Sequence, residues 1–400
     1  MALVESPEIL LPKSSIDLHK WACIACDQFT SEIAYWNHLH QLVDNVPSSY
    51  HIILPEAYLE LGFETRITQV NDNMHLYLRN HIFETHEGIV LVDRQTPFHP
   101  QRSGLVVLID LDQYEFAEGR KGKIIASEKT VLNRIPPRVK IREKAPIEIP
   151  HVIVLFDDKG GIIPDLYRKR HQFPLFYDFD LNMGGGHISG YLIKNAQPIL
   201  DAITLQAENN PLVVGDGNHS LAAAKVIWET MKETLSPELL VDHPARYAMV
   251  ELISIYDSGL AFEPIHRVIF NADPDDFISE FNRASYGSEP LRVITPEKEH
   301  FILTPESPFD TIHWVQGFLD HYLDSHKDVS IDYVHGSSSL QTIIRHNTRA
   351  IGIVMPPLER HSLFPYINDH GALPRKSFSL GEAVEKRYYL ESRLIQKGNE

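Results

Sequence analysis

The chain has 400 residues, a formal net charge of −17 at pH 7, and ordinary apolar (43%) and charged (23%) fractions. This composition indicates a globular protein of about two or three domains. Because affinity for nucleic acid comes largely from neutralising phosphates with lysine and arginine, the negative charge argues against a nucleic-acid partner. No apolar run approaches the ~20 residues needed to cross a bilayer, so we expect no membrane span.

The amino-terminal segment and the two cysteines point to a cytoplasmic protein. The first 15 residues, MALVESPEILLPKSS, lack a basic start and a continuous apolar core, so no secretory signal is expected. Cys23 and Cys26 stand in a C-x-x-C spacing. Two thiols are too few for a structural zinc site, and Ala22 separates them from the tryptophan of a thioredoxin-like motif. Buried or incidental thiols are therefore favoured over a redox role.

Apolar runs and helical spacing predict a mixed α/β (α+β) fold. In chain order, we expect a helix at 31–43, strands at 104–111 and 151–156, a helix at 198–208, a strand at 212–215, a helix at 219–235, strands at 246–255 and 265–270, helices at 275–284, 309–326 and 338–346, and a strand at 350–355. Strands and helices interspersed in this way favour an α/β protein over a sandwich or a bundle.

Two proline-containing breaks suggest an N-terminal α/β region at 1–145, a central domain at 146–290 and a C-terminal α/β region at 291–400. The first break is the basic stretch 134–144, and the second lies at 290–308, where prolines cluster. The basic residues within 374–377 have little else to explain them in an acidic chain. We therefore expect the C-terminal region to fold back on the central site.

The segment 211–225, PLVVGDGNHSLAAAK, contains the main candidate site. A short apolar run followed by helical spacing places Asp216, Gly217, Asn218, His219 and Ser220 on a strand-to-helix turn. The glycines allow close backbone approach, and the N–H groups of a first helical turn attract phosphate or carboxylate. The alternative is a capped helix with Asp216 or Asn218 as the cap, which leaves the His-Ser pair unexplained.

The stretch 118–144 is strongly basic, with lysines and arginines far outnumbering glutamates. Its basic residues are Arg120, Lys121, Lys123, Lys129, Arg134, Arg138, Lys140, Arg142 and Lys144. Such a local positive field would concentrate a polyanionic substrate, and Arg134 and Arg138 are preferred because arginine binds phosphate bidentately. Glu128 would serve there as a general base or metal ligand. The alternatives are a solvated loop and a simple ion-pair partner.

Three histidines, His187, His219 and His266, are further candidates because histidine shuttles protons near neutral pH. A lone histidine is more often structural, but His219 lies beside the expected anion seat. No His-Glu-x-x-His, P-loop or Gly-x-Ser-x-Gly motif is present. The glycine-rich run 183–190 does not fit Gly-x-Gly-x-x-Gly and no strand is expected before it, so it is interpreted as a flexible loop near the site.

The chain resembles DUF1015, a bacterial and archaeal family of unknown function, on motifs that follow the family's order. These are Ser127-Glu128-Lys129-Thr130 with Arg134 and Arg138, Gly186-His187, Asp216-Gly217-Asn218-His219-Ser220 (family Asp-Gly-His-His-Arg), Pro264-Ile265-His266-Arg267 and Pro374-Arg375-Lys376-Ser377. The opening Trp21 to Gln28 and the closing Glu385 to Glu391 look like one subgroup of that family. The resemblance covers nearly the whole chain.

The turn is also similar to the nucleotide-handling turn of the ParB and sulfiredoxin superfamily, which includes kinases acting on free serine. This similarity implies a ParB/sulfiredoxin-like central region. Sulfiredoxin chemistry needs a cysteine before the histidine, where this chain has Asn218, so that activity is not expected. Ser220 stands where related turns use an arginine on phosphate, so another arginine, from Arg138, Arg267 or Arg375, is expected to supply the charge.

The leading hypothesis is a phosphotransferase acting on a small hydroxylated metabolite, with free serine as the first guess and a nucleotide or pyrophosphate as donor. Such transfer needs positioning, positive charge on the phosphate oxygens and a carboxylate for the acceptor hydroxyl. The predicted catalytic residues are Asp216, His219 and Glu128, and the predicted phosphate- or substrate-binding residues are Gly217, Asn218, Ser220, Arg138, His187, His266, Arg267, Arg375 and Lys376. Magnesium would accompany the donor, while haem, flavin and zinc are not predicted. The alternatives are a non-catalytic sensor of a nucleotide or phosphometabolite, and a phosphomonoester hydrolase.

Overall fold

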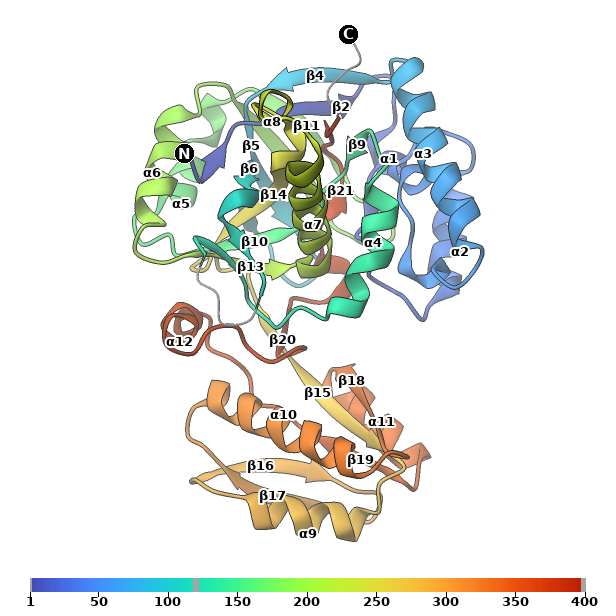
Figure 1. Ribbon diagram of the computed structural model, residues 1–400, viewed down its shortest axis with the longest axis vertical. Coiled ribbons are helices and arrows are strands. Elements are labelled where there is room, and N and C mark those ends of the chain that lie inside the picture. The colour runs from blue at the N-terminus through green and yellow to red at the C-terminus, as the bar shows by residue number, and fades with distance from the viewer. Residues whose placement is uncertain (1, 118–121, 397–400) are drawn as a thin grey trace. The chain divides into compact units, whose positions relative to one another are not determined.

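The computed structural model describes residues 2–117 and 122–396, which form two compact units. The first unit comprises Met1–Leu260 and Glu382–Glu400, and the second comprises Ala261–Gly381. Helices and strands occur in both units, which confirms the mixed α/β class (Figure 1). Every strand and helix predicted above is present, with ends shifted by a few residues.

A ten-stranded mixed sheet forms the centre of the first unit. Its strands, in spatial order, are β11 (Leu175–Asp180), β12 (His187–Ile193), β5 (Ile89–Gln95), β6 (Arg102–Asp110), β14 (Tyr247–Ser254), β10 (Ile153–Phe156), β13 (Leu212–Asp216), β8 (Ile124–Ala126) and β7 (Tyr114–Glu115), with β1 (Val4–Glu5) paired to β6. β13 runs parallel to β8 and antiparallel to β10. The sheet therefore joins segments on both sides of residue 145, where a domain boundary was predicted.

The sheet is covered on both faces, as the alternation along β6 shows. Leu105, Val107 and Ile109 pack into one apolar core, whereas Val106 and Leu108 pack into another. Successive strand residues point to opposite faces, so a strand that is apolar at every position must be buried on both. This explains why β6 has no exposed residue along its length.

Helices complete the two cores of the first unit. They are α1 (Leu18–Trp21), α2 (Ile33–Val43), α3 (Phe63–Arg79), α4 (Ile135–Arg142), α5 (Ile162–Arg168), α6 (Gln197–Gln206), α7 (Asn218–Thr234) and α8 (Pro237–Leu240). The core beneath α2 and α3 includes Trp36 and Met74, and the opposite core includes Ile203 of α6 and Trp228 of α7. Helix α4 lies beside α7 (Figure 1).

Three short strand pairs tie the chain ends to the first unit. They are β2 (Glu8–Pro12) with β4 (Phe83–Glu87), β3 (Cys23–Ile24) with β21 (Tyr388–Tyr389), and β9 (Ile147–Glu148) with β22 (Arg393–Leu394). The last two pairs return the segment after residue 381 to the first unit. The residues 374–377, which prompted the expectation that the C-terminal region folds back, belong instead to the second unit.

The second unit is an antiparallel sheet with four helices. The sheet order is β17 (Glu299–Thr304), β16 (Glu289–Ile294), β19 (Ala350–Ile353), β15 (Phe262–Phe270) and β18 (Ser330–His335), and β20 (Phe378–Leu380) pairs with β15. The helices are α9 (Pro274–Ala284), α10 (Pro308–Ser325), α11 (Ser337–His346) and α12 (Leu363–His370). Rings of α9 and α10 stack on each other, with Phe281 4.5 Å from Phe318 between ring centroids.

The prolines at 290–308, from which a boundary was predicted, lie inside the second unit. Pro290 is part of β16 and Pro308 is at the start of α10, where Ser307 caps the helix. Proline suits the first helical position because its fixed φ and missing N–H cost nothing there. These prolines therefore mark element ends, and the division between the units falls near residues 260 and 381 instead.

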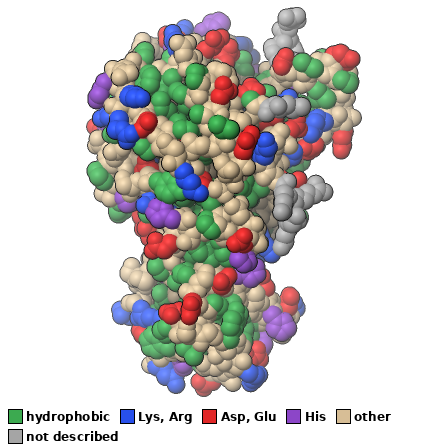
Figure 2. Space-filling view, turned by 90° about the vertical axis from the view of Figure 1, so that its left-hand side faces the viewer, with side chains coloured by type: hydrophobic (Ala, Val, Ile, Leu, Met, Phe, Trp, Pro, Cys, Tyr) green, Lys and Arg blue, Asp and Glu red, His purple; other side chains and the backbone are tan. Residues whose placement is uncertain are grey.

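Within the described residues, no helix is long and apolar enough to cross a membrane. On the face shown in Figure 2, lysine and arginine side chains are scattered among acidic, apolar and other residues.

Candidate functional site

The turn at 216–220 joins β13 to α7 through a glycine. Gly217 is the N-cap residue and has a left-handed backbone (φ 78°), where an added Cβ would lie 3.0 Å from Val152 Cγ2. No side chain caps the helix, and Asp216 Oδ1 instead accepts a hydrogen bond from the Gly217 N–H at 2.9 Å. Neither Asp216 nor Asn218 is the cap, so the alternative of a simple capped helix is wrong.

A second predicted motif lies beside this turn. β8 runs parallel to β13, so the loop that follows β8 leaves the sheet at the same end as the turn. The Ser127 N–H donates to the Val214 carbonyl at 3.0 Å, and the Val131 N–H donates to His219 Nε2 at 3.2 Å. The structure therefore brings the half-buried Glu128, carried on this loop, next to the 216–220 turn.

Three buried polar atoms around the turn have no hydrogen-bond partner among the described residues. They are Ser127 Oγ, Thr130 Oγ1 and Asn218 Oδ1. A buried polar atom left unpaired costs about 1–3 kcal/mol, and native proteins leave few of them. Three such atoms on a loop and an adjoining helix start are what a site that hydrogen-bonds a ligand would contain.

The cation nearest Asp216 is a lysine that sequence reasoning did not select. Lys386 Nζ lies 3.2 Å from Asp216 Oδ2, and the lysine is only 5% exposed. It comes from the segment that follows the second unit. The closing motif Glu385 to Glu391 was recognised in the sequence but given no role. Lys386 of this motif meets Asp216 only because the chain returns to the first unit after residue 381.

Three residues of the predicted basic stretch are paired with acidic side chains. Arg138 forms an ion pair with Glu56, Lys140 lies 2.8 Å from Glu64, and Arg142 lies 3.0 Å from Glu148. Arg120 and Lys121 of the same stretch lie outside the described residues. The local positive field is therefore smaller than the sequence suggested, although Arg138 still lines a cavity that Ser220 also lines.

Ser220 contacts a histidine from a distant part of the chain. Its Oγ lies 3.2 Å from His151 Nε2, and the Tyr389 hydroxyl lies 2.8 Å from His151 Nδ1. Asp27 Oδ2 is 3.9 Å from His151 Nε2. Burial raises the pKa of Asp27, but the neighbouring His151, a hydrogen bond from Gln28 and the charges of Lys386 and Arg138 outweigh it and hold the pKa below its ordinary value. This carboxyl is therefore ionised at neutral pH.

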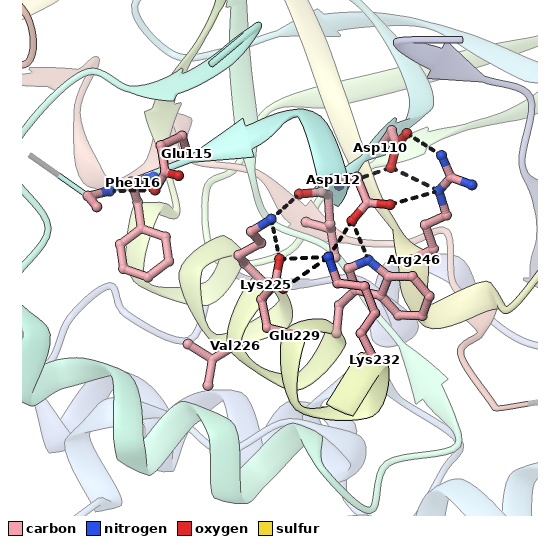
Figure 3. A network of polar contacts seen from close by, with 12 residues as sticks. Asp110, Asp112, Glu115, Phe116, Lys225, Val226, Glu229, Lys232 and Arg246 are labelled. Atoms are coloured by element: carbon pink, nitrogen blue, oxygen red, sulfur yellow. Dashed lines mark hydrogen bonds and ion pairs between the residues drawn. The ribbon is translucent and has the colours of Figure 1, made fainter. Parts of the chain in front are cut away.

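Helix α7 is held in place by charged side chains far along its length from the turn (Figure 3). Lys225 Nζ donates to the Leu111 carbonyl at 2.9 Å, and Lys232 Nζ lies 2.7 Å from Asp112 Oδ1. Asp112 also accepts from the Trp228 indole at 2.8 Å. These contacts fix the helix against the loop before β7 and so fix the position of its first turn.

The predicted site residues of the second unit make contacts within that unit. His266 Nδ1 accepts the Met355 N–H at 3.1 Å, and burial, followed by the charge of Arg267, lowers the pKa of His266. Arg267 is 0% exposed and donates to the carbonyls of Ile265 and Lys376. Arg375 Nε donates to the Tyr333 hydroxyl at 3.0 Å. The guanidinium of Arg267 is thus used for folding.

His187 lies on a β-hairpin, and the glycine-rich run before it is the hairpin turn. The expectation that no strand precedes this run is wrong, because β11 precedes it and β12 begins at His187. His187 Nδ1 lies 2.7 Å from Asp180 Oδ1, and Nε2 lies 2.9 Å from Asp178 Oδ1. These hydrogen bonds raise the pKa of His187 despite its partial burial.

Among the described residues, one group of side chains has the spacing of a possible metal site. It consists of Asp276, Glu280 and His326 in the second unit, and Asp276 is exposed. Glu128 and Asp216 are the predicted carboxylates at the turn, and carboxylate oxygens are the ligands that Mg²⁺ prefers. Either carboxylate therefore fits a magnesium ion that arrives with a phosphorylated donor.

These features define a mixed α/β protein whose candidate site lies at a strand-turn-helix junction. The chain belongs to DUF1015, a family of proteins of unknown function, whose sequence model matches residues 10–326. None of the curated proteins matches the sequence.

Several solved structures resemble the fold at low identity. A conserved hypothetical protein from Pyrococcus furiosus is 10% identical, with a TM-score of 0.38 and coverage of 73% of this chain and 95% of that chain. A free serine kinase in complex with AMP is 9% identical, with a TM-score of 0.38 and coverage of 73% and 91%. SbnI with a C-terminal truncation, from Staphylococcus aureus, is 9% identical, with a TM-score of 0.38 and coverage of 73% and 83%.

Proposed function

We propose that the protein transfers a phosphoryl group from a nucleotide or pyrophosphate to the hydroxyl of a small metabolite at the 216–220 turn. The observation that carries this proposal is the pair of buried hydroxyl oxygens, Ser127 Oγ and Thr130 Oγ1, which lack partners beside the first turn of α7. A phosphate seated there would accept hydrogen bonds from both hydroxyls and from the helical N–H groups, which also carry partial positive charge.

Glu128 is the group that we assign as the general base. Glu128 is half-buried and lies on the loop that runs beside the 216–220 turn, where the Val131 N–H donates to His219 Nε2. In the transfer step, the acceptor oxygen forms a bond to the terminal phosphorus, the bond from phosphorus to the donor's bridging oxygen breaks, and Glu128 takes the acceptor's proton. Lys386 and Arg138 pair with Asp216 and Glu56, and they exchange these partners for the phosphate when the donor binds. His219 orients the 127–131 loop through the Val131 N–H.

Free serine is the first acceptor to test, with a nucleoside triphosphate and magnesium as the donor. This choice rests on the resemblance of the turn to that of the superfamily that includes free serine kinases. A phosphomonoester hydrolase would use water in place of the acceptor, and a sensor would bind the nucleotide without turnover. Release of labelled phosphate without an acceptor would favour the hydrolase, and tight binding without release would favour the sensor.

The proposal is tested by following labelled phosphate from ATP to the acceptor, with Glu128→Gln as the variant. Loss of the base should lower the rate by about a hundredfold or more at an unchanged melting temperature. Glu143→Gln is the matched control, because Glu143 is an exposed carboxylate at the end of α4. Equal rates for both variants would exclude Glu128 as the base, and no acceptor-dependent transfer by the unaltered protein would exclude the proposed reaction.

A further inference from the structure

A cavity of about 130 Å³ opens beside the first turn of α7 and lies entirely within the first unit. Apolar side chains form most of its lining, among them Ile53, Leu54, Met74, Ile141, Ala223 and Ala224. A dry apolar cavity of roughly 150 Å³ is large enough to bind benzene. The cavity therefore has room for a compact organic molecule whose body is apolar.

Hydrogen-bonding groups gather on one side of the cavity. Ser220 Oγ and His151 Nε2, which lie 3.2 Å apart, both belong to its lining. Tyr389, also in the lining, holds His151 through a 2.8 Å contact with Nδ1. A ligand hydroxyl that replaced this direct contact would find one donor and one acceptor, whichever ring nitrogen carries the proton.

The charged side chains of the lining are paired with one another. Arg138 pairs with Glu56, and Arg142 lies 3.0 Å from Glu148, whose other carboxylate oxygen accepts from Arg393. Burial raises the pKa of Glu148, but the two arginines outweigh it and keep this carboxyl ionised. A ligand that carried its own charge would lose hydration in the cavity without gaining an unpaired counter-charge, which is costly.

We propose that this cavity binds the acceptor of the transfer reaction, and that the acceptor is a small neutral alcohol with an apolar body rather than the free serine that the resemblance of the turn suggests. This inference rests on the proposed function, because Ser220 belongs both to the cavity and to the turn that seats the phosphate. The acceptor hydroxyl lies beside Ser220, at the end of the cavity that adjoins the 216–220 turn and the loop that carries Glu128, and its apolar body lies against Ala223 and Ala224 of α7.

Binding is measured by calorimetry on the full chain without nucleotide, using three probes of one shape. Benzyl alcohol is expected to bind with a Kd of about 1 mM or tighter. Benzoate and benzylammonium carry a charge of either sign and are expected to bind at least about tenfold more weakly, as is free serine. Equal affinity for the three aromatic probes, or binding of serine alone, would overturn the inference.

Two variants and one control test whether benzyl alcohol binds in the cavity rather than elsewhere on the protein. Ala223→Leu fills the cavity and should abolish the binding of benzyl alcohol, whereas Thr230→Leu adds the same apolar group on an exposed position of the same helix and should leave it unchanged. Ser220→Ala removes only a hydroxyl and should weaken binding by about tenfold. Binding that survives both Ala223→Leu and Ser220→Ala would contradict the proposal.

The outcomes distinguish this inference from the proposed function. Cavity-dependent binding of benzyl alcohol, with no phosphoryl transfer to any alcohol, would support the neutral pocket and exclude its role as an acceptor site. Transfer to free serine without binding of benzyl alcohol would overturn the inference and leave the phosphotransferase in place.

Discussion

His187 in the first unit and His266 in the second belong to two of the family motifs, yet the structure gives them opposite electrostatic surroundings. His187 is partly exposed and lies between Asp178 and Asp180, which raise its pKa. His266 is 3% exposed, accepts a backbone N–H and has its pKa lowered by burial and by Arg267. The comparison shows that a motif residue's chemistry is set by its neighbours, which raise the pKa of the histidine in one unit and lower it in the other.

The buried arginines of the two units differ in the same way. Arg387 of the first unit pairs with Glu251 and Glu391, and all three side chains are at most 3% exposed. Arg267 of the second unit donates mainly to backbone carbonyls. Removing either arginine leaves buried acceptors, but only in the first unit are those acceptors charged.

The largest expected effect is therefore on the first unit. Arg387→Met should lower the free energy of unfolding by about 3–5 kcal/mol, because two buried carboxylates lose their arginine and Glu391 keeps only the hydrogen bond from the Tyr177 hydroxyl. The loss is measured by urea unfolding, with hydrogen exchange as the probe that reports on each unit separately. The matched control is Arg292→Met in the second unit, where Arg292 and Glu299 are 33% and 45% exposed and the expected loss is below about 1 kcal/mol. Equal losses would show that burial does not distinguish the two pairs.

Next in size is the effect of removing Arg138, which pairs with Glu56 and is proposed to exchange that partner for the nucleotide's phosphate. Arg138→Ala should weaken nucleotide binding by about ten- to a hundredfold, which corresponds to roughly 1.5–3 kcal/mol for a charged hydrogen bond. Ser220→Arg should partly restore affinity in that variant. Arg375→Ala, in the second unit, is the comparison, and titration calorimetry with ATP is the measurement. A larger loss of ATP affinity for Arg375→Ala than for Arg138→Ala would assign the phosphate contact to Arg375 instead.

Acidification should destabilise the second unit through His266. Its folded pKa lies below the ordinary value of 6.5, so the unfolded chain binds more protons in this window. The stabilisation is present above pH 6.5 and is lost as the pH falls from 6.5 through the folded pKa. His266→Asn keeps an acceptor for the Met355 N–H but does not titrate, so it should remove this dependence. If the pH profile of hydrogen exchange is the same in His266→Asn as in the unaltered protein, the acid destabilisation does not come from His266.

The smallest effect is expected at His187, with the opposite sign. Its folded pKa lies above 6.5, so its contribution to stability is complete below pH 6.5 and is lost as the pH rises through the folded pKa. The pairs are exposed, with Asp178 and Asp180 at 50% and 82%, so the change should be only about 0.2–1 kcal/mol. His187→Gln should abolish it, and NMR titration of the imidazole should give a pKa above the ordinary value; a lower one would refute this prediction.

The sequence predicted those elements whose signal is local. The 211–225 segment has a short apolar run, a glycine that adopts a positive φ and helical spacing after it, and each of these acts within a few residues. Helix α3 was not predicted, because polar residues such as Asn71 interrupt the apolar positions on its buried face. The hairpin strand β11 was missed for a related reason, since its outer residues face solvent at the edge of the sheet.

The sequence by itself determined the fold class and the strand-turn-helix junction, with the helix beginning directly after Gly217. Only the tertiary structure decided which side chains meet there. His151 comes to Ser220 from 69 residues away, and Tyr389 comes to His151 from 238 residues away. Lys386 reaches Asp216 because the chain returns to the first unit after the second. Such contacts depend on strand pairing between distant segments, which no local periodicity specifies. For the same reason, the sequence could not predict the ion pairs of Arg138 with Glu56 and of Arg142 with Glu148.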